Sequence, residues 1–382
     1  MTDTWALRLV FLLQPLALGA WFPRIPQVQH SIGLSEGTLA FALIGMPIGL
    51  LIALIFGSKL AAQLGTRGLL TVGLTIYLAA MPLPAFATSG PMLFAALGVA
   101  GMCMAIAQLA LNVTASEVEA RSVRPIMNSC HGFWAIGVLL GSAIGATMAE
   151  IRVTPGLAML IVSATSLTPL IFCAWQVTDY PLPAAEKAQT TEPKPSKLLI
   201  YIALFGFGVA MTEGAMADWS AVFMTNIFDA SPGVAGASYT VFALCVALGR
   251  FQGDALKARY AVDNLAQCLV AIALTGLFVT LTSPFIWLSF IGIAMLGLGV
   301  SLGFPLAVSA ASGLRGRSSA GNVTILTQLT LCGFLIGPPM IGLIAELGNM
   351  RLGLAALCPA LLLALVSARA LKPQAATSSD GL

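Results

Sequence analysis

The sequence predicts an all-α integral membrane protein with twelve transmembrane helices arranged as two six-helix repeats. Three observations carry this prediction: the composition, a series of long apolar runs, and a similarity between the two halves of the chain. Of the 382 residues, 58% are hydrophobic and 9% are charged, and the mean hydropathy is +0.94, whereas a soluble domain is about one-quarter charged. This composition excludes a cytosolic enzyme, a nucleic-acid-binding protein and a disordered chain.

The apolar runs are long enough to cross a membrane, because a spanning helix needs about 20 mostly apolar residues. Charges and turn-forming residues separate them, and Ser35 and Ser231 precede two predicted helices in the manner of N-caps. The first run carries Asp3 and Arg8 and ends in a Pro-rich turn, so we do not interpret it as a signal peptide. The twelve predicted spans cover residues 6–28, 37–61, 68–88, 91–114, 126–149, 156–176, 198–224, 235–252, 263–282, 284–310, 319–345 and 351–371.

The basic residues give the bundle a predicted orientation. With the N-terminus in the cytoplasm, 15 of the 18 basic residues fall on the cytoplasmic side, and only Arg24, Arg152 and Arg351 fall outside. Cytoplasmic loops of membrane proteins carry this excess of Lys and Arg. We therefore expect an even number of spans, with the N- and C-termini both cytoplasmic.

A polar segment divides the predicted spans into six and six. It is rich in Pro, Thr, Lys and Glu, a composition typical of an interdomain linker. The expected domains are an N-terminal six-helix bundle (1–176), a cytoplasmic linker (177–197), a C-terminal six-helix bundle (198–371) and a cytoplasmic tail (372–382).

The two halves share sequence at matching positions. Predicted spans 2 and 8 end in FGSKLAAQLGTR, from Phe56, and FQGDALKARYA, from Phe251, at an offset of 195 residues. Spans 5 and 11 end in GSAIGATMAE and GPPMIGLIAE, closing on Glu150 and Glu346 at an offset of 196. Two offsets that agree indicate an internal duplication. A parallel repeat of six and six spans is typical of an alternating-access transporter.

Two stretches carry a resemblance to a known family. They are RPIMNSCHGFWAIGVLLGSAIG (124–145), and EGAMADWSAVF (213–223) with GRFQGDAL (249–256). Together with the twelve spans they resemble the major facilitator superfamily, in particular small bacterial inner-membrane permeases related to fucose permeases, over essentially the whole chain. The resemblance implies the major facilitator fold and a location in the bacterial inner (cytoplasmic) membrane. It also implies secondary active, proton-coupled transport of a small polar organic solute, sugar-like or zwitterionic, by alternating access.

The loop between spans 2 and 3 departs from the family pattern G-x-L-A-D-R-x-G-R-[RK]. Residues 58–67 read SKLAAQLGTR, so Ala62 and Gln63 stand at the acidic and first basic positions. In the family this loop holds the cytoplasmic gate through charge pairs, and we expect that interaction to be weaker here. The remaining candidate gate residues are basic or acidic side chains near helix ends: Arg24, Arg67, Arg124, Arg250 and Asp254.

Glu213 is the strongest candidate for proton coupling. It lies slightly past the middle of the predicted seventh span, at about 1.5 Å per residue along the helix. Insertion scales assign a central acidic side chain a cost of about 2.5–3.5 kcal/mol, so such residues mark function more often than they do in soluble cores. The functional interpretation is a carboxyl that loads a proton or binds the solute. The structural alternative is a carboxyl satisfied by neighbouring helices.

Two further residues are candidates for proton coupling. Asp218 lies near the outer end of the same span and, five residues on, is expected to face away from Glu213. We expect it to pair with Arg24 in an outer gate, or to be an ordinary interfacial residue. His131 lies in the cytoplasmic third of span 5, and an imidazole, with a pKa in water of about 6.5, suits a proton carrier.

Neutral polar and aromatic residues inside the spans are the candidates for solute binding. Gln108 and Asn112 share one face of span 4, and Thr327 falls at the repeat position of His131. The full set of candidate substrate-binding residues is Gln14, Gln108, Asn112, Trp134, Trp219, Thr327 and Gln328.

Two other functions stay open at this stage. A partial match of span 5 to an antiporter motif, with glycines at 137, 141 and 145, allows a proton-driven exporter of amphiphilic compounds or drugs. A non-transporting membrane sensor is a third hypothesis, although the short loops offer little surface for a soluble partner. We expect no enzyme activity, and also no ATP-driven pump, because the sequence has no G-x-x-x-x-G-K phosphate-binding loop. The seven cysteines fall in apolar runs, so we expect them to be buried, with no metal site and no cofactor. The expected partners are a small-molecule substrate, protons and the lipid bilayer, with no nucleic acid, and the expected state is a monomer.

Overall fold

The structure is a computed structural model that describes residues 2–122, 126–180 and 193–372. Within these ranges the chain is helical and contains no β-strand. Twelve of the described segments are long and apolar enough to cross a membrane, which confirms the predicted all-α fold and the number of spans. Arg124 and residues 181–192 of the predicted linker lie outside the described residues.

The first half of the chain, residues 2–180, contains six of these spans. Its elements are α1 (Asp3–Leu13), α2 (Leu16–Trp21), η1 (Phe22–Arg24), α3 (Ile25–Ser31), α4 (Glu36–Leu43), α5 (Gly45–Ala80), η2 (Leu83–Phe86), α6 (Gly90–Ala120), α7 (Met127–Glu150) and α8 (Pro155–Gln176). The first span is interrupted at Gln14 and Pro15, because proline has no backbone N–H to continue the helix. The second and third spans join through Gly65 in α5, whose φ of 66° is a conformation that glycine adopts without steric strain.

The second half, residues 193–372, contains the other six spans. Its elements are α9 (Lys197–Phe228), α10 (Pro232–Arg259), α11 (Val262–Thr282), α12 (Ile286–Val300), α13 (Gly303–Ser312), α14 (Ser319–Glu346), α15 (Met350–Ala355), α16 (Leu357–Ser367) and η3 (Ala368–Leu371). Side-chain caps begin several helices, as at Ser196, whose hydroxyl oxygen accepts a hydrogen bond from the Leu199 N–H at 3.2 Å. The predicted cap at Ser35 is confirmed by its bond from the Thr38 N–H.

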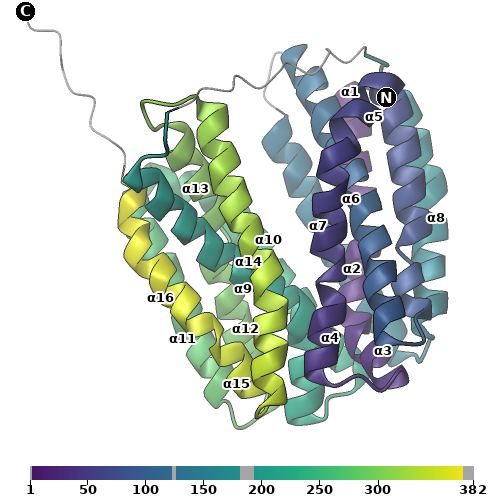
Figure 1. Ribbon diagram of the computed structural model, residues 1–382, viewed down its shortest axis with the longest axis vertical. Coiled ribbons are helices and arrows are strands. Elements are labelled where there is room, and N and C mark those ends of the chain that lie inside the picture. The colour runs from purple at the N-terminus through teal and green to yellow at the C-terminus, as the bar shows by residue number, and fades with distance from the viewer. Residues whose placement is uncertain (1, 123–125, 181–192, 373–382) are drawn as a thin grey trace, which may run out of the picture.

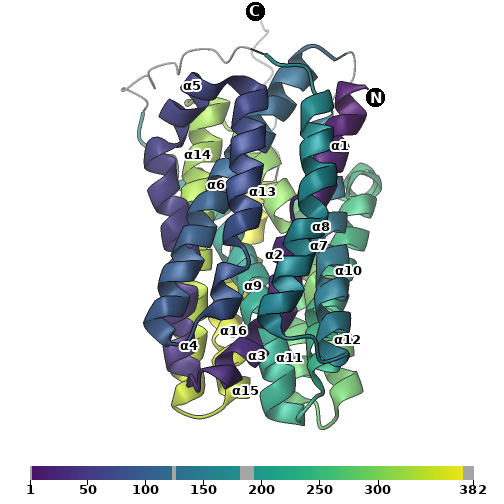
Figure 2. The same ribbon diagram turned by 90° about the vertical axis from the view of Figure 1, so that its right-hand side faces the viewer.

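The helices gather in two groups that run along the long axis of the molecule (Figures 1 and 2). One group consists of α1 to α8 and the other of α9 to α16 (Figure 1). The first and last described residues, 2 and 372, lie toward the same end of the molecule (Figure 1), which we call the terminal end. The opposite end, where α3, α4 and α15 lie, is called the distal end (Figure 1).

Hydrogen bonds join the two halves at the distal end. Glu150, at the end of α7, accepts hydrogen bonds from the Ser231 hydroxyl (2.8 Å) and the Gly233 N–H (2.9 Å) at the start of α10. Glu346, at the end of α14, accepts one from the Gly37 N–H (2.7 Å) at the start of α4. Each carboxylate therefore satisfies a free N–H in the first turn of a helix in the other half, where negative charge is favoured. We call these two groups the distal latches.

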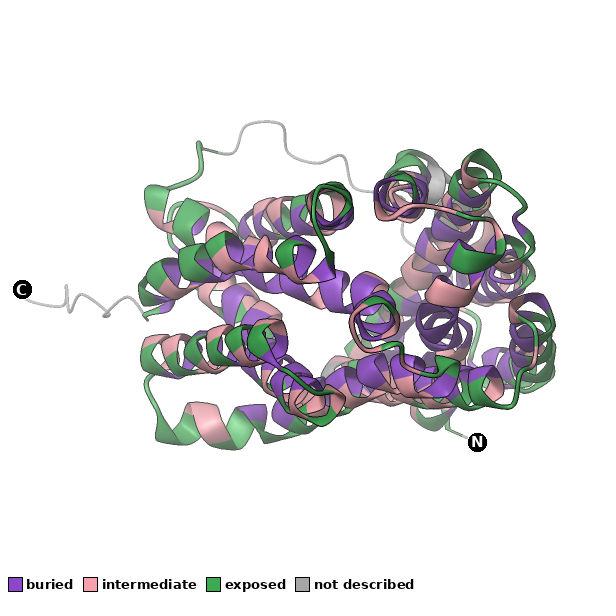
Figure 3. Ribbon diagram, turned by 90° about the horizontal axis from the view of Figure 1, so that it is seen from below, coloured by how far each residue is buried: buried purple, intermediate pink, exposed green. Residues whose placement is uncertain are grey.

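The outer flanks of the two groups are apolar and exposed. Phe172, Trp287 and Val366 are among the exposed large hydrophobic residues, with 62%, 69% and 71% of their surface accessible. Figure 3 shows exposed positions on the outward faces of the helices and buried positions where helices meet. Such an apolar outer surface is stable in contact with lipid and agrees with a membrane-spanning bundle.

Candidate functional site

A cavity of about 410 Å³ lies between the two halves. The first half contributes residues of α2, η1, α4, α5, α6 and α7, and the second half contributes α9, α10 and α14. Most of the lining side chains are apolar. The charged and amide side chains that line it are Gln108, Glu213, Asp218 and Arg250.

Glu213 and Arg250 form an ion pair on the wall of this cavity. The Nη2 of Arg250 lies 3.3 Å from Oε1 and 3.5 Å from Oε2 of Glu213. About one-fifth of the Glu213 side chain and one-third of the Arg250 side chain remain accessible, at 22% and 31%. The carboxyl that sequence analysis placed deep in span 7 therefore faces the cavity beside a positive charge. Arg250, a candidate gate residue in the sequence, lies inside the cavity as its partner.

The backbone of span 10 holds Arg250 in place. The Arg250 Nε donates to the Ser301 carbonyl at 3.2 Å. In a continuous helix this carbonyl would accept the N–H four residues on, but that residue is Pro305, which has none. Gly249 lets α10 approach this break, because a Cβ at that position would lie 2.2 Å from the Ser301 Oγ.

Asp218 also lines the cavity, on the same helix as Glu213. The expectation that these two residues face apart is not confirmed. Gly214 and Ala217 lie in the arc between them and are small, so the cavity follows this whole side of α9. Among the described residues, Asp218 has no hydrogen-bond or ion-pair partner.

The expected pair between Asp218 and Arg24 does not form in this structure. Arg24 is fully buried, and its Nη2 donates to the Val153 carbonyl in the loop after α7. Its Nε and Nη1 have no partner among the described residues. The Val153 carbonyl thus accepts the hydrogen bond that the Asp218 carboxylate was expected to accept. Arg24 therefore connects η1 to a loop of the same half.

Three candidate substrate-binding residues of the first half meet in one cluster. The Gln14 Oε1 accepts hydrogen bonds from Trp134 Nε1 (3.1 Å) and from Gln108 Nε2 (3.5 Å). Gln108 and Trp134 line the cavity, whereas Gln14 is fully buried behind them, and its Nε2 has no partner in the described part of the chain. Gly137 brings α7 against the first span, because a Cβ there would lie 2.1 Å from the Leu12 carbonyl.

The other candidate substrate-binding residues do not line the cavity. Asn112, Thr327 and Gln328 are exposed, and the Thr327 hydroxyl donates to the Val323 carbonyl of its own helix at 2.8 Å. Trp219 is fully buried, and its Nε1 has no partner among the described residues.

Two candidates with other assigned roles also lie away from the cavity lining. His131 is exposed, and its ring contacts Phe11 edge-on with 5.4 Å between centroids. The Asp254 side chain is 92% accessible and pairs with Lys257 of the same helix at 2.9 Å.

Sequence reasoning missed the aromatic part of the cavity wall. Tyr239 packs against Phe22 of the other half, with 4.7 Å between ring centroids, and stacks on Phe242. Tyr239 lies within electrostatic range of Glu213, Asp218 and Arg250. A signal was present, since Tyr239, Phe242 and Arg250 recur at helical spacing on one face of α10.

Arg67, a candidate gate residue, lies in a separate network with Asp179 and Val177 at the terminal end. Its backbone N–H donates to the Asp179 Oδ1 at 3.0 Å, and its Nη2 donates to the Val177 carbonyl at 3.1 Å. The Thr66 hydroxyl donates to the same carboxylate at 3.1 Å. The family pattern has an acidic residue in this loop at the position that Ala62 occupies here. Asp179, at the start of the predicted linker, thus brings an acidic side chain to the same loop.

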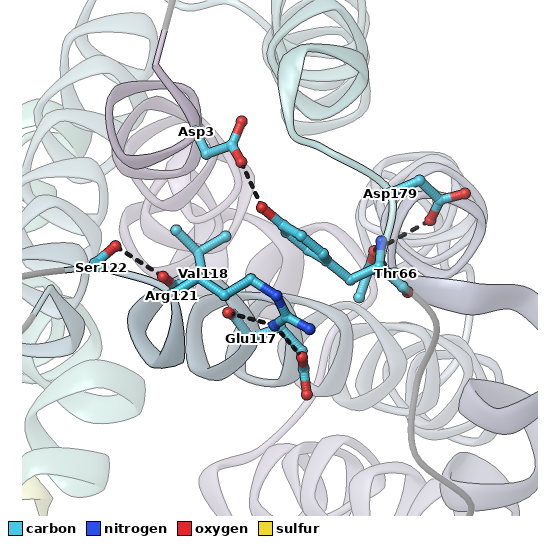
Figure 4. A network of polar contacts seen from close by, with 8 residues as sticks. Asp3, Thr66, Glu117, Val118, Arg121, Ser122 and Asp179 are labelled. Atoms are coloured by element: carbon cyan, nitrogen blue, oxygen red, sulfur yellow. Dashed lines mark hydrogen bonds and ion pairs between the residues drawn. The ribbon is translucent and has the colours of Figure 1, made fainter.

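Tyr180 extends this network to two further helices. Its hydroxyl donates to the Asp3 Oδ2 at 3.0 Å, and the Arg121 guanidinium lies over its ring at 4.2 Å from the centroid. Figure 4 shows Asp3, Thr66, Arg121 and Asp179 gathered around this ring. We call Asp3, Thr66, Arg67, Asp179 and Tyr180 the linker clasp, because they fix the first linker residues to the first half.

The cysteines are less buried than expected, and none of the described residues form a metal cluster. Cys268 and Cys332 are exposed, whereas Cys130 and Cys173 are buried. No group of three or more His, Cys, Asp or Glu side chains in the described part of the chain could hold a metal ion.

Comparison with known families gives a match along most of the chain. The family model described as Major Facilitator Superfamily matches residues 8–330. An uncharacterized MFS-type transporter of Yersinia pestis is 29% identical and covers 95% of this chain and 94% of its own length. Membrane protein MosC of Rhizobium meliloti is 26% identical over 88% of this chain and 82% of its own.

Solved structures show the same fold at low sequence identity. A bacterial homolog of the human lysosomal transporter Spinster, in an inward-facing and occupied conformation, has a TM-score of 0.75 at 16% identity, covering 96% of this chain and 95% of its own. The Escherichia coli fucose:proton symporter FucP has a TM-score of 0.65 at 15% identity, covering 97% and 98%.

Proposed function

This chain belongs to the major facilitator superfamily, and from that premise we propose a secondary active transporter of the bacterial inner membrane. It moves a small organic solute through the central cavity by alternating access, and Glu213 couples the movement to protons. The observation that carries the proposal is the Glu213–Arg250 ion pair on the wall of a cavity between the two halves. The named transport activities of FucP and of the Spinster homolog support a transporter rather than an enzyme.

The charge distribution supports an inward-facing state for this structure. The positive-inside rule places the terminal end in the cytoplasm, and an even number of spans returns the chain to that side. The distal latches then join the two halves on the outer side. In this state the cavity would exchange solute with the cytoplasm.

The cavity favours a solute with a substantial apolar surface. Its volume of about 410 Å³ suits a small organic molecule. Few hydrogen-bonding side chains line it, whereas a sugar needs many partners when it leaves water. The sequence predicts a sugar-like or zwitterionic solute. The cavity favours, more specifically, a molecule with one charged or polar end and an apolar body.

The same apolar wall favours export as a second candidate function. A proton-driven exporter of amphiphilic compounds would use such a cavity, whereas the glycines of the partial antiporter motif serve helix packing, because they bring α7 tightly against the first span. Gly141 and Gly145 lie where a Cβ would come 2.2 and 2.5 Å from carbonyls of α2. The direction of net transport separates export from import.

Coupling through Glu213 follows from its pairing. When Glu213 is ionised, its carboxylate and the Arg250 guanidinium attract each other across 3.3 Å. A proton on Glu213 removes this attraction and changes the charge of the cavity wall by one unit. Solute binding and protonation therefore affect each other, which is the requirement for coupled transport.

The test uses the full chain in proteoliposomes. A thermal-shift screen of the purified protein against sugars, amino acids, organic acids and amines first identifies a stabilising compound. We expect a pH gradient to drive uphill movement of this compound in the unmodified protein, and Glu213→Gln to abolish uphill movement while keeping exchange. Glu117→Gln makes the same chemical change in an ion pair with Arg121, outside the cavity, where the carboxylate is about as accessible as that of Glu213, and is the matched control. Uphill transport that survives Glu213→Gln would contradict the coupling role.

A further inference from the structure

Asp218 is a carboxyl without a partner in an apolar cavity. Three charged side chains of the described residues line the cavity, and two of them, Glu213 and Arg250, pair with each other. Asp218 makes no hydrogen bond or ion pair in the described part of the chain. A charge in apolar surroundings is costly unless a partner compensates it. The missing partner is therefore a cationic group or a proton supplied from outside the chain.

The surroundings of Asp218 suit an organic cation. Trp21, Phe22, Tyr239, Phe242 and Phe334 line the same cavity. The faces of aromatic rings attract ammonium groups, by about 0.5–2 kcal/mol depending on how far the site is desolvated. The same rings provide the apolar surface against which a hydrocarbon body packs.

Other ligand charges fit this wall less well. An organic carboxylate would have to displace Glu213 from Arg250, and it would then bind in a cavity that also holds the Asp218 carboxyl. The described lining residues include no Lys or His to offset that repulsion. A neutral solute would leave Asp218 without a counter-charge.

We propose that the solute of this transporter is an amphipathic organic monoamine. Its ammonium group binds the Asp218 carboxylate, and its apolar body lies along the aromatic wall formed by α2, η1, α10 and α14. This inference rests on the proposed function, since it names the chemical class that the transport cavity accepts. It also gives Asp218 a role separate from that of Glu213: Asp218 selects the charge of the solute.

Three matched probes test the charge selection directly. They are 2-phenylethylamine, 2-phenylethanol and 3-phenylpropionate, which share the phenyl body and differ in the terminal group. Calorimetric titration of the purified full chain in lipid nanodiscs gives their affinities. We expect the amine to bind at least about tenfold more tightly than the alcohol, because the ammonium–carboxylate bond is charge-assisted.

Variants of Asp218 test whether this side chain causes the preference for the amine over the alcohol. We expect Asp218→Asn to reduce amine affinity about tenfold, to the level of the alcohol, and to change alcohol affinity less than about twofold. Asp218→Glu keeps the charge and should retain the preference for the amine. Asp229→Asn is the control, because Asp229 is exposed at the end of the same helix in a left-handed conformation that Asn also adopts. Unchanged alcohol binding shows that the variants are folded.

Three outcomes would overturn the assignment: tighter binding of the carboxylate than of the amine, amine binding that survives Asp218→Asn, or no binding of the amine at millimolar concentration. Flux of the bound probe across proteoliposomes separates this inference from the proposed function. Transport of the carboxylate would keep the transporter and reject the amine. Amine binding that depends on Asp218, without flux, would keep the binding class and reject transport.

Discussion

In one distal latch the Glu150 carboxylate bonds Ser231 and Gly233, and in the other the Glu346 carboxylate bonds Gly37. Gly37 and Glu346 lie 196 residues from Gly233 and Glu150, whereas the counterpart of Ser231, Ser35, caps its own helix at Thr38. In both latches a carboxylate at the end of one helix accepts the N–H of a glycine in the first turn of a helix from the opposite half. The latch geometry is thus present twice, related by the internal repeat. The repeat detected in the sequence therefore has a structural counterpart at this end of the molecule.

The cavity shows the opposite pattern. Glu213, Asp218 and Arg250 all belong to the second half, and the same offset of 196 leads to the apolar residues Ala17, Phe22 and Leu54 in the first half. The first half contributes Gln108 and Trp134, which are neutral, to the cavity wall. The comparison indicates that the repeated halves share the contacts that join them, whereas the charged chemistry of the cavity is confined to one half.

The largest effect is expected from removing the ion pair that the second half contributes to the cavity wall. Arg250→Met leaves the Glu213 carboxylate unpartnered and should lower the free energy of unfolding by about 1–3 kcal/mol, less than for a fully buried pair because both side chains are partly accessible. The double variant Glu213→Gln/Arg250→Met should recover most of that stability without recovering coupled transport. Thermal denaturation in detergent measures the first effect, and a double variant no more stable than Arg250→Met would contradict the pairing.

The distal latches are expected to have the next largest effect. Glu150→Ala and Glu346→Ala each remove a charged acceptor of backbone N–H groups, and we expect a loss of about 1–2 kcal/mol per variant, because both carboxylates are exposed and water replaces part of the lost interaction. We expect each variant to populate a state with a wider distal end, and the double variant to do so additively. Distances between spin labels at Ser31 and Asp229, both exposed at this end, measure the shift. If only one of the two variants changes the distances, the latches are not equivalent.

A smaller effect is expected in the neutral wall of the first half. Gln108→Leu removes the hydrogen bond that Gln108 donates to Gln14, worth about 1 kcal/mol, and should lower the free energy of unfolding by about that amount. Proton-driven uphill transport should persist, because no charge changes. Thermal denaturation in detergent measures the first effect, and the proteoliposome assay measures the second. Loss of uphill transport would show that coupling is not confined to the second half.

The smallest effect is expected at the linker clasp. Tyr180→Phe removes the hydrogen bond to Asp3 but keeps the ring under Arg121, so we expect the loss of about 0.5–1.5 kcal/mol and unchanged transport. Tyr260→Phe is the control, because Tyr260 is 58% exposed. Melting temperatures of the two variants give the comparison, and equal values would show that the hydroxyl adds nothing to stability.

Hydropathy and helix-start residues were enough to predict the fold. The length of apolar runs is a physical requirement of the bilayer, so the twelve spans follow from composition along the chain. Glu213 could be selected because an acidic residue deep in a span is costly, and the structure places it in the cavity. Its partner could not be selected, since the position of Arg250 beside Glu213 depends on how two helices pack.

The errors at other positions have similar physical causes. Arg24 was expected to pair with Asp218, but a backbone carbonyl, which every residue carries, accepts its hydrogen bond. Asp218 and Glu213 were expected to face apart, because they are far apart around the helix axis. The residues between them are small, so the cavity reaches both side chains. Polar residues such as Asn112 and Thr327 look alike in sequence whether they face a cavity or the outside, and here they are exposed away from the cavity lining.

Under the proposed coupling through Glu213, Pro305 has a consequence for the order of events during transport. By leaving the Ser301 carbonyl free, it gives Arg250 an anchor on the backbone that does not titrate. When a proton neutralises Glu213, the guanidinium loses one partner and keeps the other, so the positive charge stays at the same place on the wall. Protonation then alters the electric potential inside the cavity without requiring a side chain to move first. Pro305 is not expected to contact the solute, yet it determines where the positive charge of the cavity wall is held.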